Sequence, residues 1–182
     1  DNPVIKLFWG RADIFSASSY YKFSKGGKVQ QLIHQLKYRG QKEIGKTIGK
    51  FYGSELKESA LFNSVDTIIP VPLHQKKLKK RGYNQSDSFA EGLAMGMKVG
   101  FDLQNLVRTV ATETQTRKSR FARFKNVDSI FALKNPEKLE GKHILLVDDV
   151  ITTGSTLEAC ANKLLSVPGT KVSVATIACA DH

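Results

Sequence analysis

The sequence has few of the features that would place it among secreted, membrane-spanning or fibrous proteins. Its only cysteines, Cys160 and Cys179, are too few for a disulfide scaffold or a four-cysteine zinc site. No stretch approaches the roughly 18 to 20 consecutive apolar residues of a membrane-spanning helix, and no signal-peptide pattern opens the chain. Glycine and proline show no bias of the fibrous kind. We therefore expect a folded cytoplasmic protein without a membrane span, and both cysteines to be buried, inert thiols.

Acidic residues are scarce as well. There are 17 Asp and Glu against 28 Lys and Arg, so the formal net charge is +11 at pH 7. Most of the excess lies in residues 70–126, concentrated in two basic windows at residues 76–81 and 117–125. Concentrated positive charge attracts polyanions such as phosphorylated small molecules, pyrophosphate or nucleic acid. A basic run taken alone is equally compatible with a solvated surface.

Strand and helix patterns alternate along the chain. Aromatic, β-branched or continuous apolar runs predict a strand or hairpin at residues 14–23 and strands at residues 65–69, 144–147 and 171–178. Helical spacing of apolar residues predicts helices near residues 29–36, 44–56, 84–98 and 155–165. This alternation favours an α/β fold with a mainly parallel sheet. A length of 182 residues suits one domain, or one domain with an appendage.

The most informative segment begins with the apolar run at residues 144–147, which is followed directly by Asp148 and Asp149. An open α/β sheet binds its ligands at the carboxyl ends of its strands, where these acids lie. Adjacent residues of a strand point in opposite directions, so we expect the two carboxylates to diverge, with one or both facing the crevice. Carboxylates suit the vicinal hydroxyls of a sugar or a hydrated Mg²⁺.

Small and hydroxyl-bearing residues follow the acids: Thr152, Thr153, Gly154, Ser155 and Thr156. They come immediately before the predicted helix at residues 155–165, where free N–H groups and the positive end of the helix dipole bind a phosphate. A ribose 5-phosphate group would match this order of acids and hydroxyls. A capped helix after a buried strand would explain the hydroxyls and the glycine, but not the two adjacent acids.

This segment resembles the phosphoribosyl diphosphate (PRPP) signature of type I phosphoribosyltransferases. Other stretches are similar to the ComF competence-protein family: LKYRG at residues 36–40, IPVPLH at 69–74, the basic window that follows it, RGYNQ at 81–85 and TETQT at 112–116. Together the resemblance covers about residues 30–180. It implies an α/β fold of the type I phosphoribosyltransferase kind, with a central parallel sheet of about five strands flanked by helices. It also implies an N-terminal hood with its helices in residues 1–60, packed as one compact unit with a core in residues 61–182.

The resemblance also implies roles for individual residues. Asp148 and Asp149 would contact the ribose hydroxyls and, indirectly, Mg²⁺, and residues 152–156 would hold the 5-phosphate. The pyrophosphate would be approached by the loop of Val71, Pro72, Leu73, His74 and Lys76. Arg81 is the basic residue assigned to catalysis, because it falls in a fixed motif. A flexible flap would include Thr114, Gln115, Arg120 and Arg123. A single histidine such as His74 is more often structural.

The implied reaction displaces pyrophosphate from the anomeric carbon of PRPP by a nitrogen nucleophile, with Mg²⁺ and basic residues stabilising the leaving group. A closing flap would exclude water. The rival hypothesis is a non-catalytic ComF-type protein that contacts single-stranded DNA or DNA-uptake proteins. In that case basic residues would follow the phosphates, and Tyr83, Phe121 and Phe124 would stack on bases. The acceptor and the oligomeric state do not follow from the sequence.

One further motif is a competing interpretation. Residues 40–47, GQKEIGKT, satisfy the phosphate-loop pattern of nucleoside triphosphatases. A true phosphate loop follows a buried strand, whereas here helical periodicity precedes the motif and continues through it in Ile44, Ile48 and Phe51. We therefore expect a turn between two helices.

Overall fold

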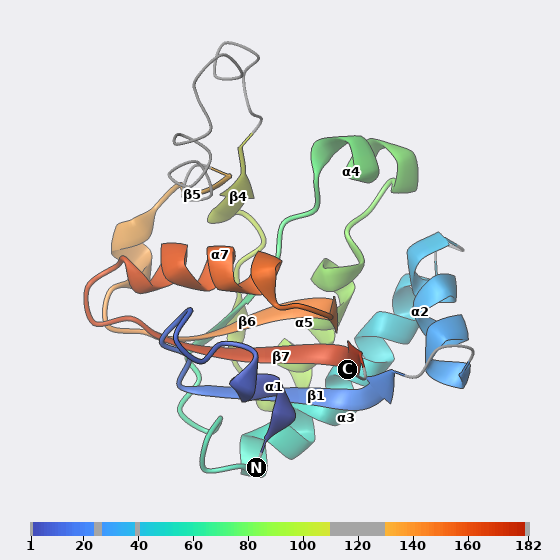
Figure 1. Ribbon diagram of the computed structural model, residues 1–182, viewed down its shortest axis with the longest axis horizontal. Coiled ribbons are helices and arrows are strands. Elements are labelled where there is room, and N and C mark those ends of the chain that lie inside the picture. The colour runs from blue at the N-terminus through green and yellow to red at the C-terminus, as the bar shows by residue number, and fades with distance from the viewer. Residues whose placement is uncertain (1, 24–26, 39–40, 110–129, 181–182) are drawn as a thin grey trace.

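The computed structural model describes residues 2–23, 27–38, 41–109 and 130–180. Its centre is a five-stranded sheet in the order β1-β7-β6-β2-β3, in which every neighbouring pair is parallel (Figure 1). The strands are β1 (Ser16–Phe23), β2 (Thr67–Pro70), β3 (Gly100–Phe101), β6 (His143–Ile151) and β7 (Lys171–Ala180). The prediction of an α/β fold with a parallel sheet of about five strands is confirmed.

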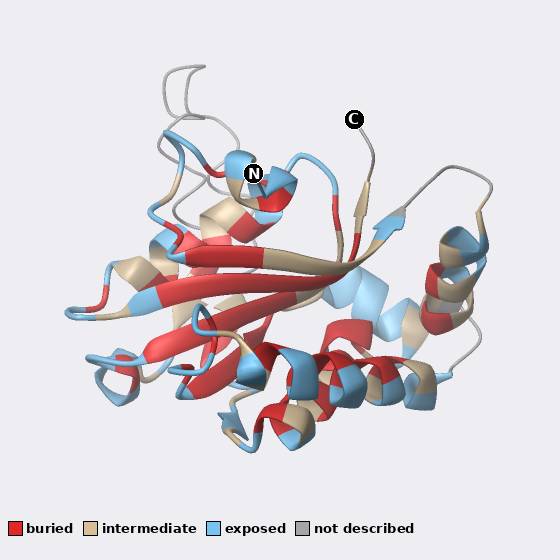
Figure 2. Ribbon diagram, turned by 90° about the horizontal axis from the view of Figure 1, so that it is seen from below, coloured by how far each residue is buried: buried red, intermediate tan, exposed pale blue. Residues whose placement is uncertain are grey.

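Helices cover both faces of the sheet, because β6 and β7 carry apolar residues on both sides. One face packs against α1 (Pro3–Lys6) and α7 (Ser155–Leu165). The other packs against α2 (Lys28–Tyr38), α3 (Lys42–Glu58) and α5 (Gln85–Met97). Figure 2 shows the buried strands as a layer flanked by helices. Residues 1–60 thus supply an edge strand of the sheet as well as helices on both of its faces.

Smaller elements lie around this core. The antiparallel pair β4 (Leu106–Arg108) and β5 (Phe131–Leu133) is followed by the 3₁₀ helix η3 (Pro136–Leu139). The short helix α4 (Gln75–Arg81) has no buried residue and stands away from the sheet (Figure 1). The sequence did not predict α4, since its basic window has no apolar face from which a helix could be recognised.

Helices α3 and α5 approach each other closely enough for their backbones to touch. A Cβ atom added at Gly92 would lie 2.1 Å from the carbonyl oxygen of Lys46, and one added at Gly49 would lie 2.5 Å from that of Phe89. No side chain fits at such distances, so glycine is required on both sides of the contact. This contact fixes α5 against the sheet and thereby positions its first turn beside the end of β6.

The helix predicted at residues 84–98 is confirmed as α5, with Asn84 as its N-cap, and the helix at residues 155–165 as α7. The turn expected at residues 40–47 is mostly helix: Lys42 to Thr47 already lie inside α3, so this segment is not a nucleotide-binding loop. Within the described ranges, no helix combines the length and the hydropathy needed to cross a membrane.

Candidate functional site

Two carboxylates meet the first turn of α5 at the carboxyl end of β6. The Oγ of Ser86 donates a hydrogen bond to Oδ1 of Asp148 (2.9 Å), and Nε2 of Gln85 donates to Oδ2 of Asp149 (2.9 Å). Strand alternation would send the two acids to opposite faces. Both acids are nonetheless reached from one helix, because Gln85 and Ser86 are adjacent residues of α5.

Local backbone bonds hold the acids in this arrangement. The N–H of Asp149 donates to Oδ1 of Asp148 (2.8 Å), and the N–H of Val150 donates to Oδ1 of Asp149 (2.7 Å). On either side of the pair the strand is regular, with Leu145 and Val147 in the core beneath α5. The acids are thus oriented by their own backbone as well as by α5.

The electrostatics of the pair favour a bound cation or proton. Burial raises the pKa of Asp148, and the negative charge of Asp149 raises it further, against the opposing effect of hydrogen bonds from the Asp149 backbone and Ser86. Lys37 of α2 partly compensates the charge, since its Nζ lies 2.9 Å from Oδ2 of Asp149. Among the described residues, the two acids share one lysine, which leaves excess negative charge when both are ionised.

Arg81, the last residue of α4, is linked to the acids through one intermediate. Its Nη1 donates to Oε1 of Gln85 (2.9 Å), and the amide of Gln85 donates to Asp149. Asn84 binds the preceding loop, because its Nδ2 donates to the carbonyl oxygen of Val71 (3.0 Å). The motif RGYNQ therefore joins the loop after β2, the helix α5 and the acid pair.

The five residues expected to bind phosphate form the turn between β6 and α7. Thr152, Thr153, Ser155 and Thr156 are exposed, while Gly154 is buried and is the N-cap of α7 with a φ of 76°. Asp148 and residues 150–157 line a small hollow of about 60 Å³. The structure thus places the hydroxyls, the helix N-terminus and one of the acids around a single hollow.

The loop expected to approach pyrophosphate begins close to the acids and leads away from them. The N–H of Val71 donates to the carbonyl oxygen of Val147 (2.8 Å), next to Asp148 in the chain. Pro72 and Leu73 are half-buried, and His74 and Lys76 are exposed. His74 caps α4, since its Nδ1 accepts from the N–H of Lys76 (3.1 Å).

Sequence reasoning missed three partners of this site. Gln85, Ser86 and Lys37 lie in the family-like stretches or beside them, but no local pattern shows that they reach the acids. Asn84 caps α5, which leaves the Ser86 hydroxyl for Asp148. The expected flap residues Thr114, Gln115, Arg120 and Arg123 lie outside the described residues.

Comparison with known proteins agrees with this geometry. Residues 78–182 match the family model described as phosphoribosyl transferase domain. The chain is 36% identical over 140 residues to DNA utilization protein YhgH of Shigella flexneri, and 33% identical over 140 residues to competence protein F of Haemophilus influenzae. The chain belongs to the ComF/YhgH family of phosphoribosyltransferase-domain proteins.

The family match covers only part of the relatives' length. The two alignments span 75% and 73% of this chain, but 61% and 60% of the ComF/YhgH relatives. Among solved structures, glutamine PRPP amidotransferase from B. subtilis superposes with a TM-score of 0.54 at 20% identity, over 79% of this chain and 30% of that chain. At this identity the superposition establishes the shared fold alone.

Proposed function

We propose that this protein binds PRPP, or a similar 5-phosphoribosyl ligand, together with Mg²⁺ at the junction of β6 and α7. The observation that carries the proposal is the arrangement there: an acid pair with excess negative charge, of which Asp148 lines the hollow, then exposed hydroxyls at a helix N-terminus. The first suits ribose hydroxyls and a divalent cation, and the second suits a phosphate. Membership of the phosphoribosyltransferase-domain family supports the same ligand class.

The residues present fit Mg²⁺ bound together with its substrate. Both acids offer hard oxygen donors, and the pKa of Asp148 is raised first by burial and then by the negative charge of Asp149. Among the described residues, no group of three or more His, Cys, Asp or Glu side chains could enclose a metal alone. Mg²⁺ commonly binds through one or two carboxylates, with water and substrate oxygens completing its ligands. Here it would neutralise charge on a departing pyrophosphate.

The protein's own groups would orient the ribose and the leaving group. Asp148 and Asp149 accept hydrogen bonds and would accept those of the 2- and 3-hydroxyls. Arg81, held by Gln85 near Asp149, would supply positive charge on the pyrophosphate side, toward the loop that begins at Val71. A nitrogen acceptor would then complete a phosphoribosyl transfer in which the C1–O bond to pyrophosphate breaks and a C1–N bond forms.

Titration calorimetry with PRPP, with and without Mg²⁺, tests the ligand. We expect Mg²⁺-dependent binding to the wild type and its loss in Asp148→Asn/Asp149→Asn. Asp66→Asn is the matched control, because Asp66 is an exposed acid at the amino end of the strands, where its Oδ2 accepts from the N–H of His143. Absence of binding at millimolar PRPP would contradict the proposal. Binding would justify a search for acceptors by pyrophosphate release.

A second candidate function is contact with single-stranded DNA, and α4 is the observation that favours it. Four lysines of α4, Lys76, Lys77, Lys79 and Lys80, are exposed, and no described acidic side chain forms an ion pair with them. Relatives of this chain carry the names DNA utilization protein and competence protein. Replacing all four lysines by alanine should weaken DNA binding and flatten its dependence on salt, because fewer counterions are released. Retained DNA affinity in Asp148→Asn/Asp149→Asn would separate this function from the first.

A further inference from the structure

An arginine from the N-terminal segment is bound to the turn between β6 and α7. Nη1 of Arg11 donates to the carbonyl oxygens of Thr153 (2.8 Å) and Leu7 (2.9 Å). Its Nη2 donates to Oγ of Ser155 (3.1 Å) and to the carboxylate of Glu158. Arg11 therefore joins α1 and the turn after it to the proposed phosphate-binding residues, 142 positions away from Thr153.

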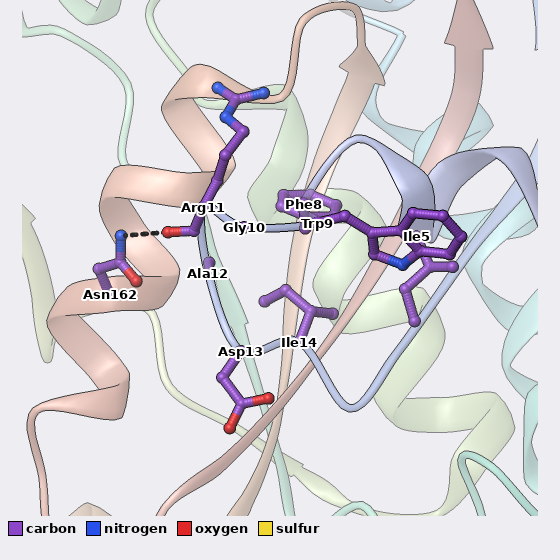
Figure 3. Close-up of a pocket in the computed structure, with 9 residues that line it drawn as sticks. All are labelled: Ile5, Phe8, Trp9, Gly10, Arg11, Ala12, Asp13, Ile14 and Asn162. Atoms are coloured by element: carbon purple, nitrogen blue, oxygen red, sulfur yellow. Dashed lines mark hydrogen bonds between the residues drawn. The ribbon is translucent and has the colours of Figure 1, made fainter.

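Apolar side chains of the same segment pack against the turn as well. Val4 and Phe8 are buried in the core under α7. A Cβ atom added at Gly154 would lie 3.6 Å from Phe8 and 3.7 Å from Leu7, so the segment covers one side of this glycine. Figure 3 shows the Arg11 side chain extending from its turn while its carbonyl oxygen accepts a bond from Asn162 of α7 (3.3 Å).

The bonding pattern gives Arg11 a structural task distinct from direct phosphate binding. A guanidinium group has four terminal N–H donors, and the four bonds to Leu7, Thr153, Ser155 and Glu158 occupy all of them. The carboxylate of Glu158 also balances its charge. Arg11 thus has little capacity left for a phosphate, and its effect on the turn is geometric.

The bond to Thr153 fixes the orientation of one peptide unit. The Thr153–Gly154 peptide is trans and planar, so the carbonyl of Thr153 and the N–H of Gly154 point in opposite directions. With the carbonyl held toward Arg11, the N–H is directed away from Arg11. A rotated peptide would instead turn the carbonyl oxygen away from Arg11 and place a repulsive acceptor where the turn should offer donors to an anion.

We infer that Arg11 is a positioning residue that holds the Thr153–Gly154 peptide in the orientation that binds the ligand's 5-phosphate. The inference rests on the proposed function and deepens it, since it assigns a role to a segment in which the sequence shows no recognisable motif. It also explains why Ser155 remains useful. Arg11 can only donate, so the Ser155 oxygen accepts that bond, and the Ser155 proton can go either to Oγ1 of Thr153, 3.1 Å away, or to a bound phosphate.

The first test needs no ligand. NMR relaxation should show a rigid Gly154 amide in the wild type, with an order parameter of about 0.85, and a value below about 0.6 in Arg11→Ala. Lys171→Ala is the matched control, because it also removes one positive charge, but at the start of β7, at the end of the sheet away from Gly154. An unchanged order parameter in Arg11→Ala would overturn the inference, as would an equal decrease in the control.

The second test separates positioning from charge and from general loosening of the fold. Calorimetry should show ribose 5-phosphate binding about tenfold weaker in Arg11→Ala, while Mg²⁺-pyrophosphate binding stays within twofold of the wild type. Arg11→Lys keeps the charge but not the fork of donors, so we expect it to restore little of the loss. Full restoration by lysine, equal loss for both ligands, or no loss would each overturn the inference.

The two proposals fail in different ways. If the wild type binds ribose 5-phosphate and Arg11→Ala binds it equally well, the role of Arg11 is wrong and the proposed function stands. If the wild type binds neither PRPP nor ribose 5-phosphate, the proposed function is wrong, and the phosphate-positioning role of Arg11 is overturned with it.

Discussion

The two ends of the central sheet hold their polar groups in opposite ways. At the amino end a chain of neutral hydrogen bonds runs from Ser64 to Nδ1 of His143 (2.8 Å), from Nε2 of His143 to Ser173 (2.7 Å), and on to Ser16 (2.8 Å). Ser16 then donates to the carbonyl oxygen of Leu61 (3.3 Å). A neutral His143 satisfies this chain, with one ring nitrogen donating and the other accepting.

The carboxyl end holds charge that the protein does not fully balance. In the described part of the chain Asp148 and Asp149 have one compensating lysine, Lys37, and the pKa of Asp148 is raised. Neutral, fully paired groups contribute stability, whereas buried excess charge costs it. The difference indicates that the amino end maintains the fold, while the carboxyl end retains an energetic cost that a ligand would relieve.

The largest expected effect comes from replacing the acid pair, which changes the carboxyl end of the sheet alone. In Asp148→Asn/Asp149→Asn we expect affinity for PRPP with Mg²⁺ to fall about 100-fold or more, because the charge that attracts the cation is gone. The free energy of unfolding at pH 7 should stay equal or rise, since the cost of burying that charge is also removed. Calorimetry and urea unfolding of the same preparation measure both quantities. A variant that loses stability in proportion to affinity would contradict the comparison.

The next prediction concerns the hydrogen-bond network at the amino end of the sheet. His143→Ala removes two hydrogen bonds and leaves Ser64 and Ser173 without their partner, so we expect a loss of about 2 to 3 kcal/mol in the free energy of unfolding. Affinity for PRPP in the folded fraction should not change, which calorimetry below the unfolding transition can check. A substantial loss of affinity would show that the two ends are coupled.

The sequence revealed the carboxyl end better than the amino end, for a physical reason. The acids and the turn before α7 are contiguous in residues 148–156, and the apolar run before them and the helix after them have strong local signals. Their partners are distant in the chain: Ser86 lies 62 positions from Asp148, and Gln85 lies 64 from Asp149. Such contacts depend on how α5 packs, which no local pattern encodes.

The amino-end network gave no sequence signal at all. Ser64 comes from the loop before β2, and Ser16, His143 and Ser173 come from β1, β6 and β7. None of them belongs to a local sequence motif. The position of β1 at the sheet edge, paired with β7, could not be predicted either, because the sequence pattern of a strand does not show which strand it pairs with. The family resemblance supplied the motif around Arg81 but assigned no role to Gln85, Ser86 or Arg11, whose contacts only the folded chain shows.

A third change lies next to the acid pair, because Thr176 of β7 is the register partner of Asp148. The hydroxyl of Thr176 on β7 is fully buried and finds no hydrogen-bond partner among the described residues. Thr176→Val keeps the shape and removes the unpaired group, so we expect the free energy of unfolding to rise by about 1 kcal/mol. Ser173→Ala, the matched control on the same strand, removes a hydroxyl with two partners and should lower it. Urea unfolding of both variants measures the change in the free energy of unfolding. A change of the same sign in both would contradict this account.

The smallest expected effect is a pH dependence that belongs to the amino end. Burial, and then the charge of Lys171, lower the pKa of His143 from 6.5, against the opposing effects of Asp66 and Ser64. Below pH 6.5 the unfolded chain takes up a proton that the folded protein resists, so this contribution to stability is full above about pH 7 and is lost as the pH falls. The raised pKa of Asp148 contributes the opposite slope. The test compares the free energy of unfolding of wild type and His143→Gln, measured in urea from pH 8 to pH 5. Both proteins contain Asp148, so its contribution cancels in the difference. We expect that difference to shrink as the pH falls; a constant difference would mean that His143 is protonated in the folded state as readily as in the unfolded one.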